Sequence, residues 1–283
     1  MTSGKMNSRK IFFILIAVAL LVLAYTFIEP YRLEMNSIDI ISRDIPVAFN
    51  GTRIVFISDI HHGPFFSRER LRGLVTTINS INPDIVLLGG DYVHRDAKYI
   101  EPCFQELSSL KAGLGKFGVL GNHDHWEGKD LTLQSMRKAG ITAIDNKAQW
   151  LYKDGARIRI GGVGDLWGDV QDILPTVEGA EESDFIILVS HSPDYVERIT
   201  TRKIDLVLSG HTHGGQVTLF GLWAPLIPSQ YGQKYRSGMI ETDYTRVIVS
   251  NGVGTITPPV RFFARPQVNI INLKKEVNNT QTR

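Results

Sequence analysis

The sequence predicts an α/β fold in which a β-sandwich is flanked by helices and preceded by a single membrane-spanning helix. Two observations predict it. Between residues 52 and 139, short apolar runs rich in β-branched residues alternate with segments of helical periodicity. This order is typical of parallel strands covered by helices. Before them lies an unbroken apolar run of 18 residues, Ile11–Ile28, and a helix of about 20 such residues spans a bilayer.

The N-terminal apolar run divides the chain into a short basic segment (residues 1–10), a transmembrane anchor (11–28) and everything that follows. Basic residues are more frequent before the run than after it, which predicts an N-terminus in the cytoplasm and the rest of the chain on the outer side of the membrane. A cleaved signal peptide is the alternative, because Val22-Leu23-Ala24 offers small residues at a cleavage-like spacing. The uninterrupted length of the run favours an uncleaved, single-pass anchor.

The segment that follows the anchor, residues 29–51, is predicted as a linker with a first strand at Ser37–Ile41. Residues 52–273 form the main domain. In its first half, three apolar runs read as buried strands: Thr52–Ser58, Asp84–Leu88 and Phe117–Leu120. Three segments have helical spacing: Ser67–Ile81, Tyr99–Lys111 and Leu131–Ala139.

The second half of the main domain reads as a further set of strands. From Ile141 to Asp169, short alternating stretches with Gly and Asp turns indicate antiparallel pairing. Four more strands are predicted after them: Phe185–Val189, Asp205–Leu208, Arg246–Ser250 and Gln267–Leu273. Residues 274–283 are a polar tail, predicted to be disordered.

Composition excludes several classes of function. The chain has 283 residues, 43% of them hydrophobic, which is enough for one large domain with an ample core. A formal net charge of +2, with no stripe of basic residues, gives no reason to expect a nucleic-acid partner. The single cysteine, Cys103, excludes an internal disulfide and a Cys-rich zinc site, and we expect it to be buried.

Polar motifs close the apolar runs, where the carboxyl ends of parallel strands form ligand sites. These motifs are Asp59-Ile60-His61, Gly90-Asp91, Gly121-Asn122-His123-Asp124, Ser190-His191 and Gly210-His211-Thr212-His213. Asp, His and Asn are suitable ligands for Mn²⁺, Fe²⁺ or Zn²⁺. A bridging carboxylate holds two such ions about 3.5–4 Å apart, where they share a water, lower its pKa and direct it at phosphorus. The motifs therefore predict a two-metal phosphoester hydrolase.

From Arg53 to about Leu273, these motifs resemble those of the calcineurin-like metallophosphoesterase family, in the same order. The resemblance implies a four-layer αββα sandwich and a phosphodiesterase or pyrophosphohydrolase with two divalent ions, Mn²⁺ first and Zn²⁺ or Fe²⁺ as alternatives. The resemblance implies that Asp59, His61 and His213 hold the first ion. It implies that Asp91 bridges the two ions. The second ion would be held by Asn122, His191 and His211.

The same resemblance implies that His123 is the catalytic residue that contacts the phosphate and assists the leaving group. Asp124 beside it would orient it, and Asn122 would join His123 in binding the substrate. Every motif position matches the family pattern, which argues against a non-catalytic binding module on the same fold. We expect no ligand role for His62, His94 or His125, which read as surface or supporting groups.

Four further stretches resemble the membrane-tethered bacterial branch of the family: residues 58–63, 213–217, 231–235 and 261–263. Members of that branch resemble metal-dependent phosphodiesterases, and some hydrolyse the pyrophosphate of UDP-2,3-diacylglucosamine in lipid A assembly. The resemblance implies a lipid-linked nucleotide-sugar substrate in a bacterial cell membrane. A generic cell-envelope phosphodiester on the outer face is the alternative, because the lipid A precursor would be met on the cytoplasmic face.

Three apolar or aromatic stretches could line the substrate site. Phe220–Pro228 could form a lid or an acyl-chain surface, or could pack on its own domain. The stretch from Arg261 to Arg265 could form a patch for anionic headgroups or a solvated strand edge. Asp165 and Trp167, in a Gly-rich stretch, could line the cleft.

Overall fold

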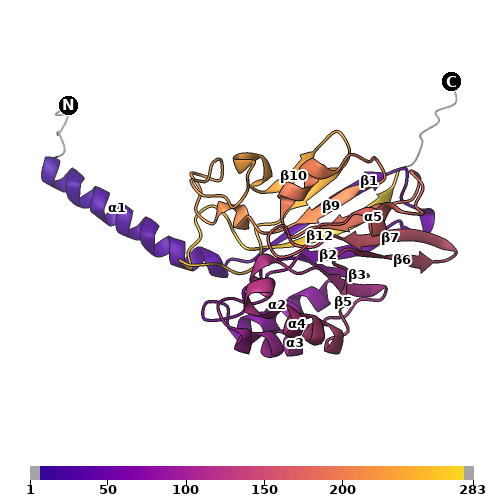
Figure 1. The fold of residues 1–283 in the computed structure, drawn as a ribbon. Coiled ribbons are helices and arrows are strands. Elements are labelled where there is room, and N and C mark those ends of the chain that lie inside the picture. The colour runs from indigo at the N-terminus through magenta and orange to yellow at the C-terminus, as the bar shows by residue number, and fades with distance from the viewer. Residues whose placement is uncertain (1–6, 277–283) are drawn as a thin grey trace, which may run out of the picture.

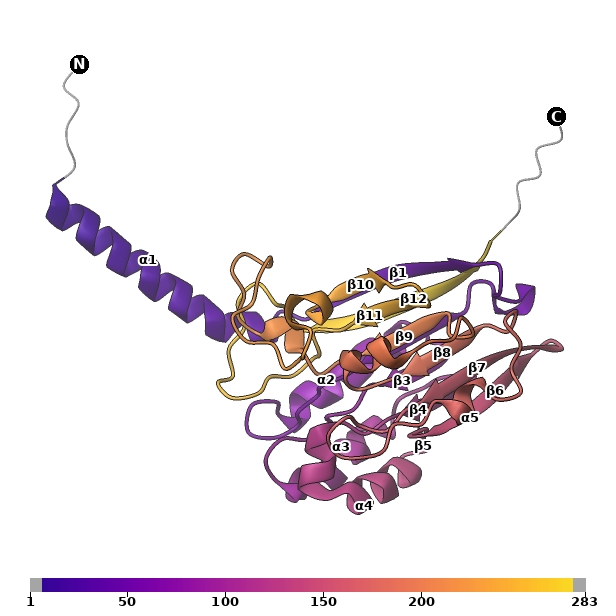
Figure 2. The same ribbon diagram turned by 45° about the horizontal axis from the view of Figure 1, so that its top comes forward.

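Two six-stranded β-sheets lie face to face in the computed structural model, which describes residues 7–276. Helices cover the outer faces of both sheets, and helix α1 (Ser8–Ile28) projects away from them (Figures 1 and 2). The predicted α/β sandwich with an N-terminal apolar helix is confirmed.

The order of strands differs from the order of the chain in both sheets. The first sheet runs β1 (Glu34–Ser42), β12 (Gln267–Lys275), β2 (Arg53–Ile57), β3 (Ile85–Leu88), β4 (Gly115–Gly118), β5 (Thr142–Ala143). The second runs β10 (Gly238–Glu241), β11 (Arg246–Val249), β9 (Leu206–Ser209), β8 (Ile186–Val189), β7 (Ala156–Gly162), β6 (Lys147–Lys153). The antiparallel pairing predicted after Ile141 is that of β6 with β7, whereas β5 pairs parallel with β4.

Three separate apolar clusters hold four layers together. Side chains on β3 alternate between two of them: Ile85 and Leu87 pack between the sheets, whereas Val86 and Leu88 pack against the helices. The third cluster covers the far side of the second sheet. Strands buried on both faces need apolar residues at every position, which is why these runs are continuous in the sequence.

The helical layers are unequal. Helices α2 (Arg68–Ser80), α3 (Ile100–Leu107) and α4 (Asn122–Lys138) cover the first sheet. The second sheet is covered by the short helix α5 (Leu174–Val177) and a 3₁₀ segment, Pro193–Arg198. Cys103 lies in α3 and is buried, as predicted.

Helix α4 begins nine residues earlier than the sequence predicts. It starts at Asn122, inside a predicted ligand motif, rather than at Leu131. Gly128, with φ of 153°, breaks the helical geometry between the two parts. The first turn is polar and Gly128 interrupts the helix. Apolar residues therefore do not recur at helical spacing before Leu131, and the sequence alone does not predict this part of the helix. The carboxyl end of the neighbouring strand, β4, is therefore joined almost directly to a helix N-terminus.

Both ends of the main domain are more ordered than the sequence predicts. β1 pairs along its whole length with β12, although it lies in the segment expected to be largely linker. β12 continues through Lys274 and Lys275, where a polar tail was expected, and the Lys274 ammonium binds Asp39 on β1 (Nζ–Oδ2 2.5 Å). Residues 277–283 of that tail lie outside the described residues.

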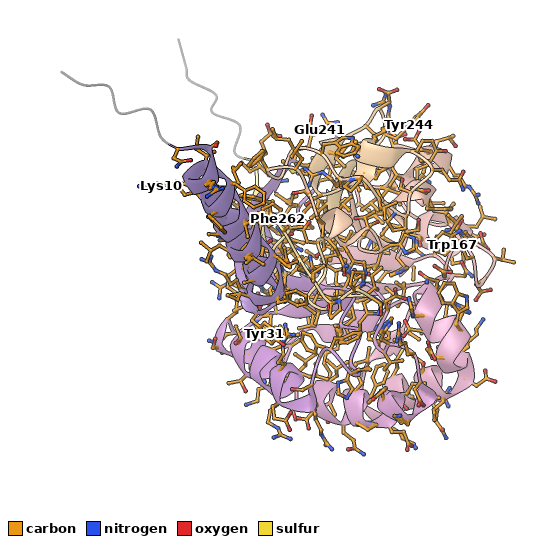
Figure 3. All side chains as sticks on the ribbon, turned by 90° about the vertical axis from the view of Figure 1, so that its left-hand side faces the viewer. Lys10, Tyr31, Trp167, Glu241, Tyr244 and Phe262 are labelled. Atoms are coloured by element: carbon orange, nitrogen blue, oxygen red, sulfur yellow. The ribbon has the colours of Figure 1, made fainter. Side chains whose placement is uncertain are left out.

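Helix α1 is attached to the domain at its C-terminal end. Its apolar side chains are exposed along the helix, and its length and composition are sufficient to cross a membrane. Just after it, the buried Glu29 carboxylate accepts the backbone N–H groups of Phe263 and Ala264 at 3.0 and 2.7 Å. Tyr25 packs edge-to-face on Phe262, which lies beside the helix (Figure 3). The helix therefore leaves the domain in a defined direction.

Candidate metal centre

Two clusters of potential metal ligands that each contain a carboxylate lie between the sheets, where strands β2, β3, β8 and β9 end, and a third group made only of histidines adjoins them. One consists of Asp59, His61 and His213. The other consists of Asp91, His191 and His211. In each cluster the potential ligand atoms lie within 4.8 Å of one another. The topology thus brings together side chains that are more than 150 residues apart in the sequence.

Asp91 lies between the two clusters. Its Oδ2 is 3.5 Å from His61 Nε2 in one cluster and 3.4 Å from His191 Nε2 in the other. Asn122, the first residue of α4, places its Oδ1 3.2 Å from His191 Nε2. All seven predicted ligands therefore lie in one continuous site.

The spacing of the histidine nitrogens fits a metal ion. His61 Nε2 and His213 Nε2 are 3.2 Å apart, and so are His191 Nε2 and His211 Nδ1. Metal–nitrogen distances of 2.0–2.1 Å in a tetrahedral site place two ligand nitrogens about 3.3 Å apart. Carboxylate, amide and imidazole donors in this arrangement are the ligands that Mn²⁺, Fe²⁺ and Zn²⁺ accept.

Burial keeps most of these imidazoles neutral. It lowers the pKa of His61 and His211 to about 3, and that of His213 well below its ordinary value. For His191 burial acts in the same direction, but the neighbouring Asp91 carboxylate outweighs it and raises the pKa to about 10. Neutral imidazoles have the free lone pair that binding to a cation requires.

Backbone contacts fix the orientation of the ligands. His191 Nδ1 lies 2.7 Å from the carbonyl oxygen of Gly89, which directs its Nε2 into the site. The His211 N–H donates to both oxygens of the Asp59 carboxylate, at 3.0 and 3.1 Å. The site is thus already organised by the protein.

Five of the seven predicted ligands have a positive φ: 53° at Asp59, 46° at His61, 55° at Asp91, 68° at His211 and 54° at His213. Side-chain-bearing residues rarely occupy this region, and such strain gathers at functional sites. The sharp turn after each strand directs these side chains toward the space between the sheets.

A segment that the sequence did not single out covers the first cluster. After β11 the chain crosses above Asp59, and Gly254 N–H donates to the Asp59 carbonyl at 2.8 Å. A Cβ at Gly254 would lie 2.1 Å from the Ile60 carbonyl oxygen, so only glycine permits this approach. The two glycines of Asn251-Gly252-Val253-Gly254 were the available signal in the sequence.

His123 lies at the edge of the site, in the first turn of α4. Its ring packs edge-to-face on His61 with centroids 4.8 Å apart, and its backbone N–H donates to Asp91 Oδ1 at 2.9 Å. The expected pairing with Asp124 is not what the structure describes. The Asp124 carboxylate accepts the backbone N–H groups of Gly121, Asp91 and Tyr92 instead. It organises the ligand turns, and Glu127 is the carboxylate nearest the His123 ring, at 3.9 Å from Nδ1.

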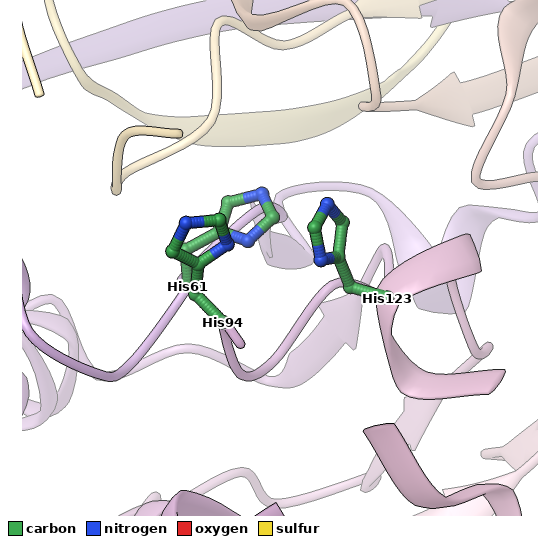
Figure 4. A group of neighbouring side chains, drawn as sticks. All are labelled: His61, His94 and His123. Atoms are coloured by element: carbon green, nitrogen blue, oxygen red, sulfur yellow. The ribbon is translucent and has the colours of Figure 1, made fainter. Parts of the chain in front are cut away.

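His94 is not at the surface: with His61 and His123 it forms a third group of potential ligand atoms, all within 4.8 Å of one another. Only 5% of His94 is exposed, and its ring centroid is 5.3 Å from that of His61 and 5.2 Å from that of His123 (Figure 4). His62 is buried and places Nδ1 2.8 Å from the Phe66 carbonyl oxygen, whereas His125 packs against Gly168.

Two tryptophans border the metal centre, Trp167 at His211 and Trp126 at His123. Trp167 packs on His211 with ring centroids 4.6 Å apart and is parallel to Trp126 at 6.5 Å. Both are more than half exposed. Asp165 is buried, and its Oδ2 accepts the N–H groups of Trp167 and Gly168, so it shapes the loop that carries Trp167.

Arg261 is fully buried, in contrast to the surface patch considered from the sequence. Its guanidinium donates to backbone carbonyls in three places: His213, the 251–254 segment and Ala264. Burial lowers its pKa to about 10, so it remains a cation at neutral pH. It joins the turn that carries His213 to the segment that covers Asp59.

Arg261→Met is expected to lower the Tm of the full-length protein in detergent by at least about 6 °C, measured by circular dichroism. Each buried carbonyl left without a donor costs about 1–3 kcal/mol, and 1 kcal/mol corresponds to about 2–4 °C in a chain of this size. Arg265→Met is the matched control, because Arg265 is exposed. Equal Tm values for the two variants would contradict the bracing role of Arg261.

A buried pair of carboxylate–histidine clusters at the strand ends of an α/β sandwich defines a metal-dependent hydrolase. Residues 52–215 match the family model for calcineurin-like phosphoesterases. The chain belongs to this family, and it is a metal-dependent phosphoester hydrolase with a dinuclear divalent metal site.

Relatives of the chain support this assignment. It is 34% identical over 252 residues to metallophosphoesterase YkuE of Bacillus subtilis, covering 88% of both chains. It is 30% identical to phosphodiesterase YaeI of Escherichia coli, over 78% of this chain and 82% of that one. It is also 30% identical to a transmembrane protein with a metallophosphoesterase domain from Danio rerio, over 86% of this chain and 57% of that one.

Proposed function

We propose that this protein is a membrane-anchored phosphodiesterase or pyrophosphohydrolase whose two ions are held by the seven clustered residues. Asp59, His61 and His213 hold the first ion, and Asn122, His191 and His211 hold the second. The observation that carries this assignment is the position of the Asp91 Oδ2, within 3.5 Å of a histidine nitrogen from each cluster. A carboxylate there would be shared by both ions. Mn²⁺ is the proposed metal, with Zn²⁺ or Fe²⁺ as alternatives.

When bound, the two ions supply an activated water nucleophile and neutralise charge on the phosphoryl oxygens. The protein supplies the remaining functions. His123, at the edge of the site, contacts the phosphate and gives a proton to the leaving oxygen, as histidine does in many hydrolases. Asn122 joins it in binding the phosphoryl group. Trp167, packed on His211, borders the site on the side of the second cluster.

The proposed substrate is a phosphodiester or pyrophosphate presented at a membrane surface, since the domain is fixed to an apolar helix. UDP-2,3-diacylglucosamine, a lipid A precursor, is the leading candidate. The alternative is a cell-envelope phosphodiester, with the catalytic domain on the outer side of the bacterial membrane. The distribution of basic residues around α1 supports that outer location.

The test is hydrolysis by the full-length protein in detergent with Mn²⁺. UDP-2,3-diacylglucosamine and bis-p-nitrophenyl phosphate are offered in parallel, with Asp91→Asn as the inactive control. Turnover of both substrates, absent in the variant, supports the proposal. Turnover of the small diester alone retains the mechanism and rejects the lipid A precursor, and no turnover of either rejects the proposed function.

Topology is tested separately with a C-terminal reporter that is active on only one side of the membrane. Reporter activity on the outer side of the membrane supports the cell-envelope phosphodiester as substrate. A cytoplasmic reporter rejects the outer location and favours the lipid A precursor.

A further inference from the structure

An apolar groove of about 460 Å³ begins beside the metal ligand His213. Val217, Leu226 and Ile227 line one wall, and Ile256 and Val260 line the other. This volume lies within the range of about 300–1,000 Å³ that is typical of ligand sites. The groove therefore has the size of a binding site and has one of the proposed metal ligands in its wall.

The two walls are held at a fixed separation. The side chain of Gln216 connects them, because its Oε1 accepts the Ile256 N–H at 2.7 Å and its Nε2 donates to the Pro258 carbonyl at 3.3 Å. On the first wall, Gln233 binds both the N–H and the carbonyl of Ala224, at 3.1 and 2.7 Å. The groove is thus formed before any ligand arrives.

Close packing also fixes the first wall against the His213 turn. Gly215 has φ of +81°, and a Cβ there would lie 2.3 Å from the Ala224 Cβ. Further along the wall, Ser229 Oγ and the Gln230 N–H donate to the two carboxylate oxygens of Asp194. The apolar stretch 220–228 is therefore tied to the domain at both ends.

Three of the four polar side chains that line the groove have partners within the protein, and the fourth is His213 at its metal-centre end. Both polar atoms of Gln216 bind backbone groups of the second wall. Thr212 Oγ1 donates to the Arg236 carbonyl, and Thr257 Oγ1 accepts from Arg95. These hydroxyl and amide groups are not free to bind a sugar or a peptide, whereas the apolar walls fit a hydrocarbon chain.

The groove lies between the metal centre and the point where α1 leaves the domain. His213 is at one end of the groove, and Val260 is at the other. The next residue, Arg261, donates its backbone N–H to the carbonyl oxygen of Thr26, in the last turn of α1, at 3.0 Å. The loops that form the groove lie on the side of the domain from which α1 projects (Figure 1).

Large apolar side chains are exposed on the loop that supplies the first wall of this groove: Leu219, Phe220, Leu222, Trp223 and Leu226. Their exposed fractions range from 49% to 81%. Such a patch beside an apolar helix is typical of a surface that meets lipid. If α1 is embedded in a bilayer, this surface faces the headgroup region from which α1 emerges.

We propose that the groove binds an acyl chain of the substrate, with the chain's phosphate held at the metal centre. The inference rests on the proposed function and deepens it, because it assigns the substrate to the phosphoesters that carry a lipid chain. The chain lies along Val217, Ile256 and Val260, and the phosphoryl group reaches past His213 to Asp91. The enzyme therefore draws its substrate from the membrane rather than from solution.

The test uses p-nitrophenyl phosphodiesters whose second ester group is methyl, butyl, hexyl or octyl, with the full-length protein in lipid nanodiscs. All release the same leaving group, so differences in kcat/KM report binding of the chain. Burial of one methylene is worth about fourfold in affinity. We expect kcat/KM to be at least about tenfold higher for the octyl than for the methyl ester.

Val260→Trp fills the groove without touching the proposed ligands, and Val47→Trp is the control at an exposed site (77% exposed). We expect Val260→Trp to bring the octyl-to-methyl ratio close to one. The control keeps the wild-type ratio. A wild-type ratio near one, or a Val260→Trp variant that keeps the high ratio, would overturn the acyl-chain site.

Binding of octyl phosphate and methyl phosphate, measured by calorimetry against protein-free nanodiscs, separates this inference from the proposed function. Tighter binding of octyl phosphate that is lost in Val260→Trp supports the groove, even if no ester is hydrolysed. Absence of hydrolysis would then reject the proposed function alone. Equal binding of both phosphates would reject the groove.

Discussion

Asp91→Asn is expected to lower kcat by about a thousandfold or more and to reduce the metal content of the purified protein from two ions per chain to one or fewer. The proposed bridge places one oxygen of Asp91 between His61 and His191. An amide has no negative charge to share between two cations, and stabilisation by the pair of ions is worth several kcal/mol. A thousandfold loss corresponds to about 4 kcal/mol.

The measurement combines steady-state kinetics with metal analysis by mass spectrometry. Asp130→Asn is the matched control, since Asp130 is an exposed carboxylate on the same helix as Asn122. It should retain two ions and wild-type kcat. If Asp91→Asn kept both ions and at least a tenth of its activity, Asp91 would not be a bridging ligand.

His123→Ala is expected to lower kcat by about 10²–10⁴ while leaving both ions in place. Its ring borders the site without belonging to either carboxylate–histidine cluster, and only 17% of its side chain is exposed. A group that protonates the leaving oxygen matters most when that oxygen is basic. The loss should therefore be larger for an alkyl leaving group than for p-nitrophenolate.

His125→Asn is the control, two residues further along α4. It lies against Gly168 rather than against the metal ligands, and we expect its kcat to stay within a few-fold of wild type. An equal loss on alkyl and p-nitrophenyl leaving groups would contradict proton donation by His123. Loss of an ion in His123→Ala would make it a ligand instead.

The strands and the turns that follow them could be predicted from the sequence because two signals coincide there. Residues 85–88 are apolar throughout, and Gly-Gly-Asp follows at once, so both the buried strand and its polar end are visible. The approach of Asp59 to His211, 152 residues later, depends on how the two sheets stack. It followed only from the resemblance to a known family.

Other features have no local signal. The Arg261 side chain is buried and donates to carbonyl groups from three segments of the chain. Because arginine is rarely buried, the sequence suggested a surface position for it. β10 (Gly238–Glu241) was missed because three of its four residues are exposed. The N-terminal part of α4 was missed because its first turns carry site residues rather than a repeating apolar face.

The position of β12 between β1 and β2 has a consequence for how the protein is made. β1 is among the first parts of the domain to leave the ribosome, yet its partner strand is among the last. Until residues 267–275 have been synthesised, β1 has no neighbour in the sheet. Completion of the last strand is therefore the step that joins β1, the strand next to the membrane helix, to the rest of the sheet. A chain that ended shortly before that strand would leave β1 unpaired.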